Sequence, residues 1–170
     1  MAPGKIVAII GFIALAGLGV WNAAPLFYDK EVQEDLPGME QESINATETS
    51  ELTTTSATSP STLSVLAEGS FTGFDSLHDA SGTARIVEVD GKRYVRFEED
   101  FSVTNGPDLY VHFGKDGKYA AEANLGRLKG NKGSQNYEIP ADISIEDYNE
   151  VWIWCRAFAV PFGTATYIMG

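Results

Sequence analysis

Residues 151–162 constrain the fold most, because they are apolar at nearly every position and include the only cysteine of the chain. At the two-residue period of a strand, the side chains divide into two sets: Val151, Ile153, Cys155 and Ala157 on one face, and Trp152, Trp154, Arg156 and Phe158 on the other. A strand that is apolar on both faces must be covered on both faces. We therefore predict a central strand with Cys155 in the interior of the domain.

Residues 1–28 are predicted to be an N-terminal transmembrane anchor. Residues 6–24 carry no charge and follow Lys5, and a stretch of about 20 apolar residues spans a bilayer as a helix. The positive charge on the short N-terminal side predicts a cytoplasmic N-terminus and an extracytoplasmic C-terminal domain. A cleaved signal peptide is the alternative, but Asn22 and Pro25 on either side of the span's end make a poor cleavage site.

Residues 29–66 are predicted to be a disordered linker. Ser and Thr supply 13 of the 24 residues from 41 to 64, and large apolar side chains are scarce there. Such a composition cannot bury enough surface to order the chain. We expect this segment to hold the following domain away from the membrane.

Residues 67–170 are predicted to form an all-β domain. Asp90-Gly91 joins residues 82–89 to residues 92–97 and has the chemistry of a two-residue type I′ hairpin turn. Its register places Ile86 opposite Val95 and Ala84 opposite Phe97. Further strands are expected at 108–113, 125–128, 135–139 and 163–169, with one short helical turn at 143–148. Short strands separated by turn signals indicate an antiparallel β-sandwich or barrel-like domain.

Charge and cysteine content exclude several classes of function. The net charge of −12 repels phosphate backbones, so nucleic acid is not an expected partner. A single cysteine excludes an internal disulfide, a CxxC redox pair and a cysteine-rich zinc site. The expected partners are the membrane, through the N-terminal helix, and a redox partner protein.

Separate sequence blocks between about residues 69 and 167 carry a family resemblance. They are Gly69-Ser70-Phe71, His78 before Ser81-Gly82-Thr83-Ala84, residues 106–111, residues 125–130 with Gly133, residues 151–158 and residues 162–165. In this order they resemble the electron-transfer DM-thirteen domain family, an all-β extracellular module often found beside DOMON domains. The resemblance implies a redox role centred on Cys155, and residues 24–30 are similar to the anchors of prokaryotic members.

The residues themselves leave the chemistry of Cys155 open. A lone buried cysteine acts as a small hydrophobic side chain, whereas a redox thiol needs a stabilised thiolate and access to a partner. A copper set could combine Cys155 with His78, His112 and Met169, although the residues after Cys155 lack the spacing of a blue-copper protein. Non-covalent haem could use His78, His112 or Met169, but the sequence requires no cofactor.

Two functions follow from this reading. The first is a membrane-anchored, extracytoplasmic redox or electron-transfer accessory domain centred on Cys155, rather than a free-standing enzyme. The alternative is a cell-surface binding or adhesion module, in which Cys155 is structural and the loops at 106–108 and 129–133 make the contacts.

Overall fold

The computed structural model of the chain describes residues 28–38 and 62–169. The membrane span predicted at residues 6–24 lies outside these ranges. Within them, no helix is both long enough and apolar enough to cross a membrane.

Strands make up nearly all of the regular structure in the described residues. In chain order they are β1 (Leu63–Gly73), β2 (Ala80–Ser81), β3 (Thr83–Val89), β4 (Lys92–Phe97), β5 (Ser102–Val103), β6 (Leu109–Lys115), β7 (Lys118–Arg127), β8 (Gln135–Glu138), β9 (Glu150–Cys155) and β10 (Val160–Met169). A 3₁₀ turn, Ile145–Asp147, precedes β9 within the helical turn predicted at 143–148.

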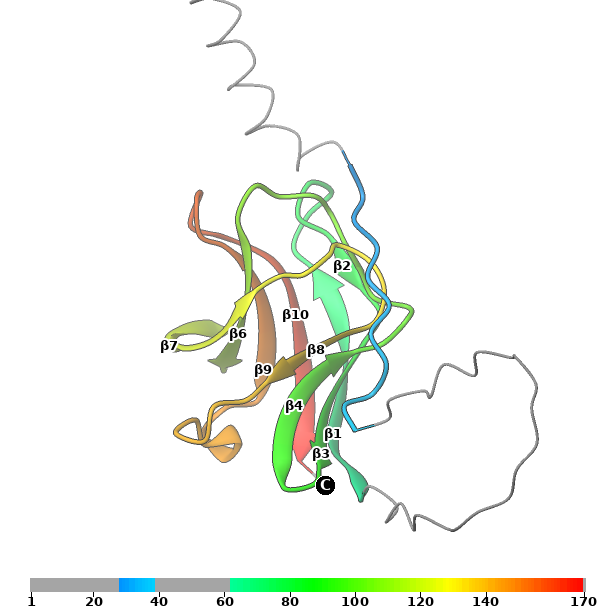
Figure 1. Ribbon diagram of the computed structural model, residues 1–170. Helices are drawn as coiled ribbons and strands as arrows, with labels where there is room; N and C mark the ends of the chain where they lie inside the picture. The colour runs from blue at the N-terminus through cyan, green and yellow to red at the C-terminus, as the bar shows by residue number, and fades with distance from the viewer. Residues whose placement is uncertain (1–27, 39–61, 170) are drawn as a thin grey trace, which may run out of the picture.

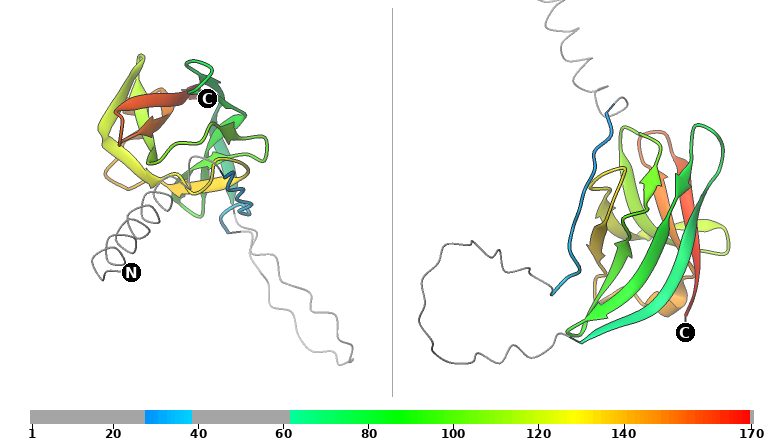
Figure 2. Two further views of the ribbon diagram at one scale, coloured as in Figure 1. Left: turned by 90° about the horizontal axis from the view of Figure 1, so that it is seen from above. Right: turned by 90° about the vertical axis from the view of Figure 1, so that its right-hand side faces the viewer.

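Eight of these strands form one antiparallel sheet that curls into a nearly closed barrel (Figure 1). The order across the sheet is β7-β6-β9-β10-β1-β3-β4-β8, and its two edge strands, β7 and β8, approach each other. The view along the axis shows the strands around a shared interior (Figure 2, left). The all-β prediction is therefore confirmed, and of the two predicted architectures the protein has the barrel.

The β3–β4 hairpin has the predicted turn and register. Asp90 and Gly91 both have positive φ angles, 51° and 77°, as a type I′ turn requires. Ile86 pairs with Val95 and Ala84 with Phe97, and all four side chains are buried. Local turn chemistry and the alternation of apolar residues thus set this part of the barrel together.

The strand predicted through residues 151–162 is instead a hairpin. β9 ends at Cys155, a turn follows, and β10 begins at Val160. Ala159 in this turn has a φ of 53°, a left-handed conformation that alanine seldom adopts. Arg156, Ala157 and Phe158 therefore belong to an exposed turn and not to either face of a strand.

The structure also differs from the linker predicted over residues 29–66. β1 already begins at Leu63, where it pairs with Val89 at the end of β3. Residues 28–38, which we call the strap, lie along the barrel beside the loop before β8 (Figure 2, right). The strap is held through its backbone, because Val32 donates to the Lys132 carbonyl and Glu34 to the Ser134 carbonyl, and the other end of the expected linker is held by the pairing of β1 with β3.

Candidate functional site

Cys155 lies at the end of β9 on the inner face of the barrel. Its residue is 0% exposed, and its sulfur is a free thiol. Leu109 on β6 and Val160 on β10 are its register partners on either side. The thiol therefore sits in the apolar core, where no reagent or partner protein reaches it directly.

A cleft of about 810 Å³ opens at the same end of the barrel. Its walls are the start of the strap, the loop 105–107 and the segment 127–131. Leu109 also lines the cleft, and it is the strand neighbour of Cys155. Leu109 therefore lines the cleft and is also paired with Cys155 in the sheet.

Arg156 is directed away from the thiol. Its Nε donates to the Asp108 carboxylate at 2.8 Å, and its guanidinium lies over the Tyr110 ring, 4.5 Å from the centroid. Arg127 approaches the same carboxylate at 3.7 Å. These charged groups mark the rim of the barrel, and Arg156 does not serve as a counter-ion for Cys155.

The outer face of β9 carries an aromatic cluster. The rings of Trp154 and Tyr119 are stacked, with centroids 4.2 Å apart and planes 4° apart. His112 on β6 meets the Tyr119 ring edge-on at 4.9 Å. We call these three side chains the outer aromatic cluster; Trp154 is the immediate sequence neighbour of Cys155, on the opposite face of the strand.

His112 is a neutral member of that cluster. Burial lowers the pKa of its imidazole below the usual value, more than its contacts with the Ala120 carbonyl and with Glu122 raise it. Its Nδ1 lies 3.1 Å from the Ala120 carbonyl oxygen, so the neutral ring donates its N–H there. The His112 ring is buried, with the Tyr119 ring packed edge-on against it.

Trp152 is fixed by a buried carboxylate. Its indole Nε1 donates to Glu150 at 2.9 Å, and the same carboxylate accepts the Gly117 N–H at 3.0 Å. Gly114 lies directly against the indole, where a Cβ would collide with the ring nitrogen. The outer face of β9 is therefore organised by specific polar and ring contacts.

His78 lies in a loop at the barrel end. Its Nδ1 is 2.9 Å from the Asp75 carboxylate, and this hydrogen bond is the main reason that the pKa of Asp75 is lowered. Its ring packs edge-on against Phe162 at 4.7 Å. His78 is thus engaged with a carboxylate and a phenyl ring at some remove from the outer aromatic cluster.

The structure does not gather the ligand sets considered for copper or haem. His112 lies on the outer face of the sheet and Cys155 on the inner face, while the Met169 side chain is outside the described part of the chain. Among the described residues, no three His, Cys, Asp or Glu side chains come within reach of one metal ion.

Sequence reasoning missed Tyr119 and the strap as parts of the candidate site. Tyr119 stands in β7, whose sequence is rich in alanine and lacks a clear strand pattern. The strap is polar and shares no local motif with the loop that it contacts.

Comparison with known proteins identifies a protein family. A family model described as electron transfer DM13 matches residues 71–167. The match includes Cys155 and the outer aromatic cluster, but not the strap. No curated protein and no solved structure shows significant similarity to the chain.

Proposed function

The chain belongs to the electron transfer DM13 family, and from this we propose that it is a membrane-anchored electron-transfer module facing out of the cytoplasm, with Cys155 as its redox-active group. The observation that carries the proposal is the position of Cys155 beside Trp154. The thiol is inside the barrel, and the neighbouring indole is stacked on Tyr119 at the outer face.

Burial of the sulfur decides which redox chemistry is available. Thiol–disulfide exchange requires a thiolate to attack a partner's sulfur directly, and a fully enclosed Cys155 cannot make that approach. Loss of one electron together with the thiol proton needs no such contact. In this step Cys155 becomes a thiyl radical, a partner protein accepts the electron, and the thiol proton leaves to solvent water through local opening of the barrel end.

The outer aromatic cluster gives the electron a route to the surface. Indole and phenol rings are the most readily oxidised side chains after the thiol, and Trp154 and Tyr119 are in van der Waals contact. Tyr119 is half-buried, so a partner protein can approach its ring. A partner docked over β7 and β9 would then exchange electrons with Cys155 without touching the sulfur.

Membrane attachment is part of the same proposal. Residues 6–24 would cross the bilayer, with Lys5 on the cytoplasmic side, and the domain would lie outside. Extraction with alkaline carbonate checks this, because a membrane-spanning chain stays in the pellet whereas a peripheral protein is released.

A binding module is the second candidate, favoured by the burial of Cys155 and by the open cleft. The loops at 106–108 and 129–133, which are the contact loops of that alternative, both contribute to the cleft walls. Clefts of several hundred Å³ with apolar walls commonly hold small ligands. In this function Cys155 only fills space in the core.

Protein-film voltammetry of the full chain separates the two functions. We expect a one-electron wave for the wild type that disappears in Cys155→Ala. In Trp154→Leu the wave should keep its potential but show slower electron exchange. Thermal melting of each variant verifies that the barrel is folded.

Two results would contradict the electron-transfer role of Cys155. If Cys155→Ala retains the wild-type wave, or if the wild type shows none while its thiol stays unreactive until denaturation, the electron-transfer role of Cys155 is wrong. Ligand screening against the cleft would then be the appropriate next experiment.

A further inference from the structure

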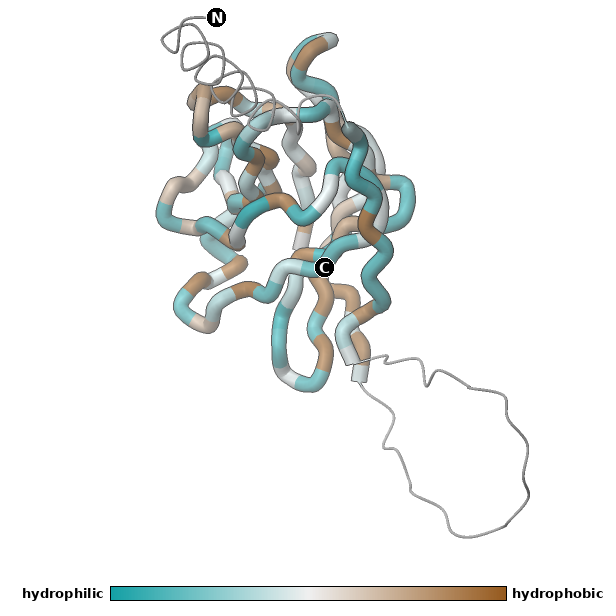
Figure 3. The backbone as a smooth tube through the Cα atoms, turned by 45° about the horizontal axis from the view of Figure 1, so that its top comes forward, coloured by the Kyte–Doolittle hydropathy of each residue, from teal (hydrophilic) through white to brown (hydrophobic). Residues whose placement is uncertain are grey.

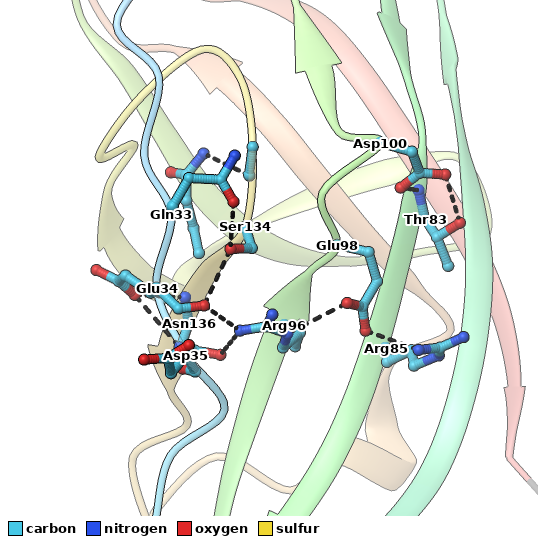
Figure 4. Close-up of polar contacts among 12 residues, drawn as sticks. Gln33, Glu34, Asp35, Thr83, Arg85, Arg96, Glu98, Asp100, Ser134 and Asn136 are labelled. Carbon is cyan, nitrogen blue, oxygen red and sulfur yellow. Dashed lines mark hydrogen bonds and ion pairs between the residues drawn. The ribbon is translucent and has the colours of Figure 1, made fainter. Parts of the chain in front are cut away.

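The strap is bound to the barrel by side chains as well as by backbone. The Glu34 carboxylate accepts hydrogen bonds from Lys129 Nζ at 2.8 Å and from the Asn136 N–H at 2.8 Å. Arg96, a buried residue of β4, donates to the Glu34 carbonyl at 2.8 Å (Figure 4). The polar strap thus makes several hydrogen bonds to the barrel, one of them with a buried arginine. Such contacts indicate that the barrel has a specific binding surface for the strap.

Two glycines of the barrel leave room for the strap. A Cβ on Gly130 would collide with the Lys30 carbonyl, and a Cβ on Gly133 would collide with the Val32 carbonyl. Gly133 also has a φ of 84°, which a residue with a side chain adopts only at a cost. The strap backbone can therefore lie close to the backbone of residues 130–133 only because both positions are glycine.

Asp29 fixes the beginning of the strap at the barrel end. Its carboxylate accepts hydrogen bonds from Asn105 and Asn131 and pairs with Lys132. The hydrogen bond from Lys132 is the largest of the effects that lower the pKa of Asp29 to about 2. The strap is therefore attached to the barrel from its second residue, Asp29.

This attachment brings the barrel end close to the proposed membrane span. Only residues 25–28 separate the end of that span at Ala24 from Asp29. Four extended residues reach at most roughly 15 Å, about the depth of one headgroup region together with the water layer next to it. The linker predicted to hold the domain away from the membrane thus comes after the strap, and cannot set the distance between them.

The barrel end that carries Asp29 also exposes large apolar side chains. Tyr28 is 74% exposed at the start of the strap, Leu77 is 75% exposed in the loop after β1, and Phe158 is 67% exposed in the β9–β10 turn. All three segments lie at one end of the barrel (Figure 1), which is turned toward the viewer in Figure 3 and shows hydrophobic stretches in its loops. Isolated exposed apolar residues are common, but aromatic and leucine side chains at loop tips beside a membrane span fit the bilayer interface.

We propose that this end of the barrel rests on the outer surface of the lipid bilayer, with Leu77 and Phe158 inserted among the headgroups. The inference rests on the membrane attachment proposed above and goes beyond it, because it assigns an orientation to the domain. The cleft opens at the same end, so a ligand of the cleft approaches along the membrane surface. With a net charge of −12, the contact is apolar and does not depend on anionic lipid.

Site-specific fluorescent probes on the full chain in phosphatidylcholine vesicles test this orientation. In a Cys155→Ala background, Leu77→Cys and Phe158→Cys would each carry an environment-sensitive label. Ile168→Cys is the matched control, because Ile168 is also apolar and 85% exposed but lies at the far end of β1 and β10. We expect a lipid-borne quencher to reduce emission several-fold at positions 77 and 158 only, and aqueous iodide to act mainly at position 168.

Equal quenching by iodide at all three positions would overturn the proposal. Protection from iodide without quenching by lipid would mean that a protein covers the loops, which overturns it as well. Carbonate extraction distinguishes the two proposals: release of the chain disproves the membrane attachment, whereas a retained chain with water-exposed probes disproves the orientation alone.

A variant that weakens the binding of the strap to the barrel provides an independent test of the orientation. The double variant Asp29→Asn and Glu34→Gln removes the charged contacts of the strap but leaves the proposed span and the barrel core intact. We expect the labels at 77 and 158 to lose most of their lipid quenching while the chain remains in the membrane fraction. Unchanged quenching would show that the strap does not orient the domain.

Discussion

The two faces of β9 are stabilised in different ways. On the inner face, Val151, Ile153 and Cys155 pack against apolar side chains of the barrel core. On the outer face, Trp152 and Trp154 are fixed by a carboxylate hydrogen bond and by ring stacking. The inner face is stabilised by close packing of apolar side chains, whereas the outer face is stabilised by a hydrogen bond and by ring stacking.

This difference explains how a strand that is apolar on both faces exists in a barrel. Such a strand predicts a covering layer on each side, which is the arrangement of a sandwich. Here the barrel core covers the inside, and side chains of β7, which lies beyond β6, and of the loop after β1 cover the outside, through Tyr119 and Phe74. Two-sided burial therefore does not require a second sheet.

The largest effect should come from the inner face. Ile153→Ala removes a fully buried side chain and leaves a cavity, so we expect a loss of about 2–5 kcal/mol in the free energy of unfolding. Urea denaturation measures it. The matched control, Ile168→Ala on the exposed end of β10, should stay within about 0.5 kcal/mol of the wild type. A loss below 1 kcal/mol for Ile153→Ala would contradict a closely packed inner face.

Glu150→Ala is expected to have the next largest effect. It removes the acceptor for the buried Trp152 indole N–H and for the N–H of Gly117, which lies in an exposed turn, and an unsatisfied buried donor destabilises by about 1–3 kcal/mol. Glu150→Gln keeps one acceptor oxygen and should recover part of the loss. Equal unfolding midpoints for the Ala and Gln variants would show that the carboxylate bonds do not organise this face.

A smaller effect is expected from the stacked rings. A double-mutant cycle of Tyr119→Leu and Trp154→Leu should give a coupling energy of about 0.5–1.5 kcal/mol, the range typical of aromatic pairs. The free energies of unfolding of the wild type, both single variants and the double variant provide the cycle. Additive losses would mean that the two rings contact each other without stabilising the fold.

Local sequence signals predicted the parts of the fold that depend on local chemistry. The Asp90-Gly91 turn set the β3–β4 register, and the strand expected at 108–113 is present as β6. The burial of Cys155 was also predictable, because its flanking residues are apolar on both faces.

The remaining parts depend on contacts between distant residues. Nothing next to Ala159 signals a turn, since its left-handed conformation is imposed by the pairing of β9 with β10. The strap is ordered only because Arg96, Lys129 and Asn136, far along the chain, provide its hydrogen-bond partners. The cleft and the Tyr119–Trp154 stack arise in the same way, so single-sequence patterns did not reveal them.

The smallest expected effect is the pH dependence that His112 gives to the outer face. Burial lowers its pKa in the folded protein below the unfolded value of about 6.5, so the unfolded chain takes up a proton first as the pH falls. His112 therefore leaves stability unchanged above pH 6.5 and destabilises the fold progressively below it, until the folded imidazole is protonated too. Urea midpoints between pH 7.5 and 5 measure this, with His78→Gln in both proteins so that His112 is the only histidine. Adding His112→Phe should flatten the profile below pH 6.5; parallel profiles would mean that His112 is not held neutral and that the outer face tolerates a charge beneath Tyr119.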